Sequence, residues 1–425
     1  MKLKLSKFVH KFLKNALYNS LNNKLIYVKD LGNLNDEERS LLINNNFLVE
    51  DDNKLLNSIQ KTIPQAPSIY NALFLLTDSC NFRCKYCYIE TPEFLNGRKF
   101  QFMSIDTAKL ACDKFIENYD LYHNKGSVTF YGGEPLLNKK VLYFVVDYLN
   151  NAISKGKIPH IEFILVTNGS LITDEDASNF KRNNIKVSIS IDGPKETNDK
   201  MRTNLKGSAF DSAINGYNIC KKYSVDLSIS CTITKYNIDI LDKIAKYFTV
   251  KLKVKSMAFN IPITVSKNDP GYVDSVLYST NIINAFKILR GYGVYEDRIM
   301  RSVISFVNGN IRIRDCNGCG LQVVFHPNGN YGPCQALLVN DEEVAGNIHE
   351  KDYKFEDNYT FKKWARRSPY LIDTCIKCSV LASCGGGCAY TAKMQNGDIN
   401  TPDYRICSYS EDVTKWLINE HSKSL

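Results

Sequence analysis

Six short β-rich runs, each followed by an amphipathic stretch, fill the chain from residue 71 to about residue 260. The stretches at 104–119 and 138–154, for example, carry apolar residues at helical spacing. Repeated β-then-α units lay successive strands parallel, so the sequence predicts an α/β fold whose sheet curves into a full or partial barrel, with the active site at the C-terminal ends of the strands. The expected strands are ALFLLT (72–77), SVTFY (127–131), IEFILVT (161–167), KVSISI (186–191), VDLSISCTI (225–233) and LKVKSMAF (252–259).

A smaller attachment is expected before this region, because 425 residues are too many for one ordinary core. Residues 1–70 predict an N-terminal α+β unit with a basic amphipathic helix over 5–21, a strand at LIYVKDL, a helix opened by Asn35 and Asp36, and the segment FLVEDDNKL. We expect this unit to pack on the main domain. A helix beside an exposed strand edge could also accept an extended peptide.

Charge and hydropathy patterns exclude several classes of protein. The net charge of +9 is spread over many lysines, and no dense basic cluster is interleaved with aromatic residues, so no nucleic acid partner is expected. No apolar run reaches the ~18–20 residues that span a bilayer, and lysines interrupt the N-terminal segment, which therefore lacks the apolar core of a signal peptide. These features predict a cytoplasmic protein without a membrane partner.

In that reducing compartment the 14 cysteines are expected to serve metal or redox cofactors and not disulfides. One group, CNFRCKYCY, follows the first predicted strand directly and contains Cys80, Cys84 and Cys87. Three thiolates can hold three irons of a cubane and leave the fourth iron open to a small molecule with an amine and a carboxylate. A zinc knuckle is the alternative, but it requires a fourth ligand, and the next histidine is His123.

This C-x3-C-x2-C pattern, with the aromatic Tyr86 just before its third cysteine, resembles the cluster loop of the radical S-adenosylmethionine (radical SAM) superfamily. The resemblance implies a partial (βα)6 parallel barrel that holds a [4Fe–4S] cluster and S-adenosylmethionine. It also implies that one electron from the cluster breaks the S–C5′ bond of the cofactor, and that the resulting 5′-deoxyadenosyl radical abstracts hydrogen from the substrate.

Polar residues at the ends of later strands are further candidates for cofactor binding. Gly132 and Gly133 in YGGEP allow close backbone approach, and Glu134 resembles the family's acidic residue that holds the methionyl amine. Hydroxyl and carboxylate groups after the third and fourth strands could bind the ribose and the methionyl carboxylate, and an arginine offers a bidentate partner for the latter. Ordinary turns are the alternative for these motifs. The residues concerned are Thr167, Asn168, Ser190, Asp192 and Arg202.

The composition changes after a helical linker at 261–310, which is interrupted at Asn-Asp-Pro-Gly (268–271). Within residues 311–425, eight cysteines lie in CNGCGLQVVFHPNGNYGPC, in a C-x2-C-x5-C-x3-C run, and at Cys407. This arrangement closely resembles the SPASM domain, a twin-cluster extension of radical enzymes that modify peptides and proteins. Two structural zinc sites are the alternative reading of the C-x2-C spacing.

The resemblance implies two further [4Fe–4S] clusters, three in all, each auxiliary cluster with four thiolate ligands. The other three cysteines fall within predicted helices or a strand and are expected to be buried small hydrophobic residues. The first auxiliary set is Cys316, Cys319, Cys334 and Cys388, the second is Cys375, Cys378, Cys384 and Cys407, and the remaining cysteines are Cys112, Cys220 and Cys231.

Gln335 departs from the family pattern. Sulfatase-maturating members usually carry an acidic residue after this cysteine as a proposed base, and glutamine cannot take a proton. The sequence therefore predicts a maturase that crosslinks a small ribosomal precursor peptide through a thioether or carbon–carbon bond, with an external one-electron reductant of flavodoxin or ferredoxin type. It identifies no catalytic base. A formylglycine-type maturase and a non-enzymatic iron–sulfur or zinc protein are the alternatives.

Overall fold

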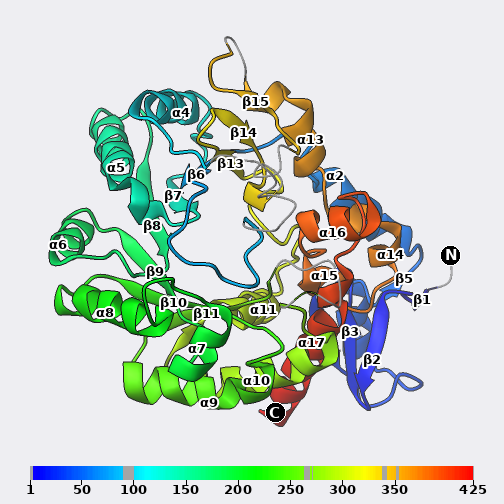
Figure 1. Cartoon of the computed structure of the whole chain (residues 1–425). Coiled ribbons are helices and arrows are strands. Elements are labelled where there is room, and N and C mark those ends of the chain that lie inside the picture. The colour runs from blue at the N-terminus through cyan, green and yellow to red at the C-terminus, as the bar shows by residue number, and fades with distance from the viewer. Residues whose placement is uncertain are drawn as a thin grey trace.

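The computed structural model describes residues 3–89, 100–262, 269, 271–336, 342–350 and 354–424. Its main feature is a ten-stranded sheet in the order β12-β11-β10-β9-β8-β7-β6-β13-β14-β15 (Figure 1). Neighbours from β12 to β13 are parallel, whereas β13, β14 and β15 run antiparallel to one another. All six predicted strands are present, as β6 (Asn71–Thr77), β7 (Lys125–Gly132), β8 (His160–Thr167), β9 (Lys186–Ser190), β10 (Leu227–Thr232) and β11 (Ser256–Asn260).

Helices cover the outer face of this curved sheet, which confirms the expected α/β architecture (Figure 1). Alternate strand residues such as Val187 and Ile189 are buried in the large core that these helices share with the sheet. The helices between strands are α4 (Ile105–Glu117), α5 (Lys139–Ser154), α6 (Asp174–Arg182), α7 (Lys195–Met201), α8 (Ala209–Lys222) and α9 (Leu241–Lys246).

The inner face of the sheet carries small polar side chains. Residues that alternate with the buried ones on β7, β9 and β10, such as Thr129, Ser188, Ser228 and Ser230, are only partly buried. A closed barrel usually fills its interior with branched apolar side chains. Hydroxyl groups in their place leave the inside of this barrel hollow.

The linker is helical, as predicted, with α10 (Ser275–Gly291) and α11 (Asp297–Val307) on either side of the short strand β12 (Tyr295–Glu296). Two of the four residues of the predicted break at 268–271 lie outside the described residues. The C-terminal region contributes three strands that extend the barrel sheet beyond β6, and helices that lie beside them. These elements are β13 (Gln322–Phe325), β14 (Asn330–Gly332), β15 (Gly346–Asn347), α13 (Tyr359–Ala365), α14 (Asp373–Ile376), α15 (Leu381–Cys384), α16 (Ala389–Asn396) and α17 (Cys407–Lys423).

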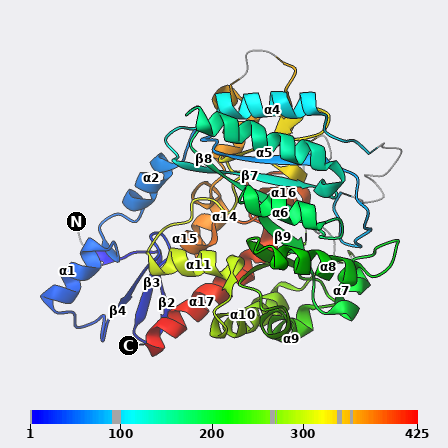
Figure 2. The ribbon, with the colours of Figure 1, turned by 90° about the vertical axis from the view of Figure 1, so that its left-hand side faces the viewer.

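The prediction of a helix over residues 5–21 was wrong. This segment forms β1 (Lys4–Leu5), β2 (Val9–Leu13) and β3 (Ala16–Asn19), and β4 (Lys24–Tyr27) completes an antiparallel sheet with β2 and β3. Asn23 adopts a left-handed conformation (φ 59°) in the turn before β4, which favours a hairpin over a continuous helix. β3 is fully buried and its Tyr18 packs with Ile418 of α17, so tertiary contacts override the helical pattern (Figure 2).

The other N-terminal predictions agree with the structure. LIYVKDL contains most of β4, and α1 (Asp36–Asn44) begins after Asn35, whose side chain accepts from the backbone of Glu38 in a capping box. FLVEDDNKL supplies β5 (Leu48–Val49) and the start of α2 (Asn53–Thr62). Cys112, Cys220 and Cys231 are buried in the core, as predicted. Within the described part of the chain, no helix is both long enough and apolar enough to cross a membrane.

Candidate cluster and cofactor site

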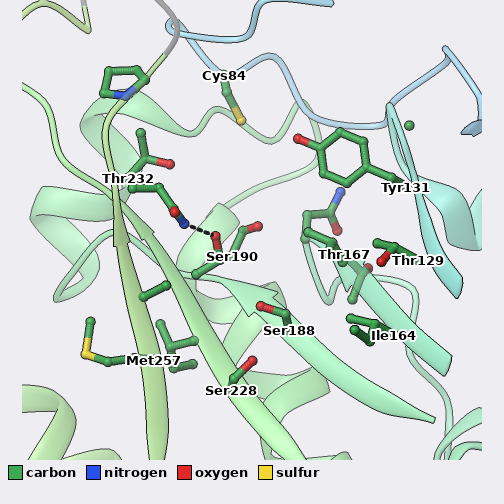
Figure 3. A pocket seen from close by; sticks show the side chains of 18 of the residues that line it. Cys84, Thr129, Tyr131, Ile164, Thr167, Ser188, Ser190, Ser228, Thr232 and Met257 are labelled. Carbon is green, nitrogen blue, oxygen red and sulfur yellow. Dashed lines mark hydrogen bonds between the residues drawn. The ribbon is translucent and has the colours of Figure 1, made fainter. Parts of the chain in front are cut away.

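A cavity of about 920 Å³ lies inside the barrel and extends to the loops that follow the strands. Hydroxyl side chains from neighbouring strands point into it, among them Thr129, Ser188 and Ser228 (Figure 3). The structure brings most of the predicted site residues together on its wall. These are Cys80, Cys84, Tyr86, Cys87, Gly132, Gly133, Thr167, Asn168, Ser190 and Arg202, whereas Glu134 and Asp192 are buried outside the lining.

The loop with Cys80, Cys84 and Cys87 follows β6 at the mouth of this cavity. The backbone N–H of Phe82 donates to Sγ of Cys80 (3.3 Å), and the Asn168 side chain lies 3.9 Å from the same sulfur. The charge of Arg202 also acts on the thiols of Cys80 and Cys84. Donors and a positive charge around these thiols favour the thiolate form that a metal requires.

The two glycines of YGGEP join the ends of β6 and β7. Gly132 has φ +138°, and a Cβ atom there would lie 2.1 Å from the carbonyl oxygen of Thr77. A Cβ on Gly133 would lie 2.2 Å from the carbonyl oxygen of Ser79. Glycine is therefore required at both positions because the chain passes close to the backbone that leads into the cysteine loop. Both glycines also face the cavity.

Glu134 is fully buried, and its carboxylate binds the end of β8. Its Oε1 accepts from Oγ1 of Thr167 (2.7 Å) and from the backbone of Leu136 (3.0 Å), while Oε2 accepts from the backbone of Asn168 (2.8 Å). Burial raises the pKa of Glu134, and these hydrogen bonds oppose that effect. The carboxylate lies behind the cavity wall formed by Gly133, Thr167 and Asn168.

Tyr86, Asp192 and Arg202 form a buried network beside the cysteine loop. The Tyr86 hydroxyl donates to Oδ2 of Asp192 (2.5 Å) and accepts from Nη1 of Arg202 (2.5 Å), and Nη1 lies 3.7 Å from Oδ1 of Asp192. Burial raises the pKa of Asp192, and the charge of Arg202 opposes this. Nη1 of Arg202 is thus already engaged, but its Nε is buried without a partner among the described residues, and Arg202 lines the cavity.

The sequence did not single out Tyr88 and Tyr131, which also line the cavity. Their hydroxyl groups neighbour each other, and the Tyr88 ring packs in apolar clusters that contain Cys87 and Cys334. Each tyrosine adjoins a motif, Tyr88 after Cys87 and Tyr131 before Gly132, and this position in the sequence could have identified both as site residues. The inward hydroxyls of Ser188, Ser228 and other strand residues were readable from strand alternation but received no role.

The second C-terminal set of thiols is gathered in one place. The thiol of Cys407 has those of Cys384, Cys378 and Cys375 as electrostatic neighbours. Burial, with these neighbours, raises the pKa of Cys375 and of Cys407 to about 12. Oγ of Ser410 lies 3.2 Å from Sγ of Cys384.

The first C-terminal set is also gathered. Cys316 and Cys319 share a hydrogen bond, and the thiol of Cys388 is an electrostatic neighbour of Cys316. Cys334 and Cys388 pack against the same apolar cluster, which includes Trp364. Gln335, which follows Cys334, lines the barrel cavity.

Cysteine thiols are the only predicted metal donors in all three sets, and iron–sulfur cubanes are held by cysteine thiolates. Each iron of a cubane takes one thiolate, so the thiolates surround the cluster at a distance from one another. In the described ranges, no three His, Cys, Asp or Glu side chains are close enough together to hold a single metal ion. The donor chemistry of the three sets fits iron–sulfur clusters.

The chain combines an open α/β barrel with a three-cysteine loop after its first strand, a polar cavity at the strand ends and a cysteine-rich C-terminal region. This combination is typical of proteins built around an iron–sulfur centre and a small cofactor. Residues 74–248 match the family model described as "Radical SAM superfamily". The central part of this chain is therefore a radical SAM domain.

Relatives of this chain include sulfatase-maturating enzymes. The chain is 36% identical to the uncharacterized protein MJ0907 of Methanocaldococcus jannaschii over 44% of this chain, and the match spans only 60% of that protein. It is 29% identical to a cysteine-type anaerobic sulfatase-maturating enzyme of Clostridium novyi, over 73% of this chain and 85% of that enzyme. It is 24% identical to the radical SAM cyclopropyl synthase TigE of Paramaledivibacter caminithermalis, over 83% of this chain and 74% of that enzyme.

Solved structures share the fold. The structure of anSMEcpe with bound AdoMet has a TM-score of 0.70 at 21% identity, covering 84% of this chain and all of that chain. The structure of Streptococcus suis SuiB bound to precursor peptide SuiA has a TM-score of 0.57 at 16% identity, covering 96% of this chain and all of that chain. The radical SAM α/β fold and the cysteine-rich C-terminal extension predicted from the sequence are confirmed.

Proposed function

We propose that this protein is a radical SAM/SPASM peptide maturase that oxidatively crosslinks a small ribosomal precursor peptide. Cys80, Cys84 and Cys87 would hold the cluster that cleaves S-adenosylmethionine, and the two C-terminal thiol sets would hold two auxiliary [4Fe–4S] clusters. An external reductant of flavodoxin or ferredoxin type would supply the electron. The bond formed is a thioether or a carbon–carbon bond.

When bound, the first cluster and S-adenosylmethionine supply a 5′-deoxyadenosyl radical that abstracts hydrogen from the substrate. The residues of the chain hold and orient these groups. The Tyr86 hydroxyl, fixed by Asp192 and Arg202, anchors the cysteine loop. The buried Glu134 orients Thr167 and Asn168 on the cavity wall, where Ser190 offers a hydroxyl to the ribose.

The observation that carries the proposal is Gln335 on the cavity wall. A neutral amide beside the reaction space cannot remove a proton, so it does not provide the base proposed for oxidation of Ser or Cys to formylglycine. Outer-sphere electron transfer to fully thiolate-ligated auxiliary clusters suits a crosslinking reaction, because no iron is left open to a substrate sulfur.

The size of the cavity supports a substrate beside the cofactor. Small-molecule sites typically occupy about 300–1,000 Å³, so 920 Å³ leaves room for a peptide side chain beside a nucleoside cofactor. TigE is named as a cyclopropyl synthase, and SuiB was solved with a precursor peptide. The N-terminal unit, residues 1–70, would offer the edge of its three-stranded sheet to an extended peptide.

A formylglycine-type maturase is the second candidate, because three relatives with matches over most of their length are sulfatase-maturating enzymes. The two candidates differ in their product. Crosslinking removes two hydrogens, so a peptide loses about 2 Da for each bond formed. Formylglycine instead converts one Ser or Cys side chain into an aldehyde.

The test begins with anaerobically reconstituted protein, which should be brown and bind about 12 irons, four for each of three cubanes. Stoichiometric zinc without cluster absorbance would contradict the proposal. The protein is then incubated with a reductant, S-adenosylmethionine and the peptide encoded beside its gene, and separately with a sulfatase-motif peptide. A 2 Da loss in the first peptide is expected. Formylglycine in the second peptide and no change in the first would overturn the proposal.

A further inference from the structure

Arg367 is a buried cation that pairs with no carboxylate in the described residues. Its side chain is buried, with 1% of the residue exposed. Every hydrogen bond that it donates goes to a neutral backbone carbonyl. The acceptors are the carbonyl oxygens of Ile399 (2.5 Å, from Nε), Gly387 (2.9 Å, from Nη1), and Gly386 and Thr401 (2.8 and 3.2 Å, both from Nη2).

A buried charge is strongly unfavourable unless an opposite charge lies nearby. Two other arginines follow that rule, since the buried Arg202 lies beside Asp192 and the partly buried Arg405 pairs with Asp403. Arg367 donates only to carbonyl groups, which solvate a guanidinium but do not neutralise it. The compensating negative charge must therefore come from another kind of group.

Cysteines assigned to both predicted clusters lie near Arg367. Its charge acts on the thiols of Cys316 and Cys319, which belong to the first auxiliary set, and on the thiol of Cys375, which belongs to the second. One cation thus faces donors from both predicted clusters.

Arg367 also holds the segment that connects the two sets. Gly385, Gly386 and Gly387 join Cys384 of the second set to Cys388 of the first. All three glycines have positive φ, +81°, +81° and +70°, a run that L-residues with side chains rarely adopt. Two of the four Arg367 acceptors are carbonyls of this glycine segment, so the guanidinium fixes the geometry between one ligand of each set.

We propose that Arg367 is a positioning residue and the shared counter-charge of the two auxiliary clusters, and that it makes both of them easier to reduce. This inference rests on the proposed function, in which the eight C-terminal cysteines hold two cubanes. A cubane with four thiolates is anionic, and its reduction adds a further negative charge. A fixed buried cation stabilises the reduced state more than the oxidised state, so net charge around a cluster sets its reduction potential.

The test compares Arg367→Met, which removes the charge, with Arg367→Lys, which retains it. Arg366→Met is the matched control, because Arg366 is the adjacent residue and is exposed to solvent. Each full-length protein is reconstituted anaerobically, its iron is counted, and its auxiliary clusters are titrated by EPR-monitored reduction. Arg367→Met should shift the one-electron reduction equilibrium at least tenfold toward the oxidised state, which is 59 mV more negative. Arg367→Lys should keep most of the wild-type potential, and Arg366→Met should match the wild type.

Arg367→Met could also lose its auxiliary clusters, and iron content then gives the answer. Retention of clusters by Arg367→Lys but not by Arg367→Met supports the counter-charge, whereas equal loss in both variants shows that only the guanidinium fork is needed and overturns it. Wild-type potentials and iron content in Arg367→Met also overturn it, and leave the proposed function intact. A wild-type protein that binds zinc and no cubane refutes the proposed function itself.

Discussion

Replacing Glu134 with Gln tests how the chain prepares its cofactor site. The carboxylate of Glu134 accepts three hydrogen bonds, from Thr167, Leu136 and Asn168, and is completely buried. A glutamine side chain has one oxygen and one NH2 group. If its oxygen keeps the two donors at Oε1, its NH2 group faces the backbone N–H of Asn168, which is also a donor. The substitution therefore removes a charge-assisted hydrogen bond and leaves two buried donors, the glutamine NH2 group and the backbone N–H of Asn168, facing each other without an acceptor.

Loss of one hydrogen bond to a charged group costs about 1.5–3 kcal/mol. At 1.36 kcal/mol for each factor of ten, this predicts that affinity for S-adenosylmethionine falls roughly 10- to 150-fold, since Thr167 and Asn168 line the cavity that binds it. The loss of negative charge behind the cavity wall acts in the same direction, because the cofactor carries a cationic amine. The first cluster should remain, because its cysteines are unchanged.

The measurement is the dissociation constant of S-adenosylmethionine by anaerobic equilibrium dialysis, with iron content determined on the same samples. Glu117→Gln is a matched control, because Glu117 is exposed at the end of α4. An affinity within about twofold of the wild type would refute the reasoning, since it would show that the site does not depend on this carboxylate.

The pH dependence of binding provides a second readout of the same residue. Burial raises the pKa of Glu134 above its ordinary value, so the side chain takes up a proton at higher pH than a free glutamate. The ionised form is the one that attracts the cationic amine. Affinity for S-adenosylmethionine should therefore fall as the pH is lowered through this raised pKa. Glu134→Gln should lack this component, and an identical pH profile in both proteins would contradict the assignment.

Three further predictions concern the cluster cysteines and the arginine of the cofactor site. Joint replacement of the three loop cysteines with Ala should abolish 5′-deoxyadenosine formation and leave about eight irons in the two remaining cubanes, and undiminished cleavage measured by chromatography would contradict this. Cys375→Ala should still cleave the cofactor but yield no crosslinked peptide by mass spectrometry, and normal crosslinking would show that the second auxiliary set is dispensable. Arg202→Ala should leave Asp192 buried without its cation, which costs about 3–5 kcal/mol of folding stability. The variant should bind the cofactor more weakly but keep the first cluster. A wild-type melting temperature and a wild-type cofactor affinity would show that the pair contributes nothing. The loop residues are Cys80, Cys84 and Cys87.

Strand alternation and cysteine spacing were sufficient to predict the barrel. Strands such as β8 and β9 repeat an apolar residue at every second position, and this short-range pattern survives in the structure because one face must pack on the helices. The same pattern located the polar residues at the strand ends, so most of the predicted site residues line one cavity. The helix over residues 5–21 failed because its apolar spacing fits a helix, whereas burial of β3 against α17 decides the conformation.

What the sequence by itself determined is the succession of the strands, the spacing within the cysteine motifs and the neutral residue at position 335, since each depends on residues that are near one another in the chain. Only the tertiary structure decided which way the polar groups point. Glu134 turns toward the end of β8 and not into the cavity, Arg202 binds Tyr86, 116 residues away in sequence, and Arg367 lies between two thiol sets with no carboxylate partner in the described residues. These contacts join segments far apart in the chain, and the energy that selects them comes from burying charge in specific surroundings, which no local pattern encodes.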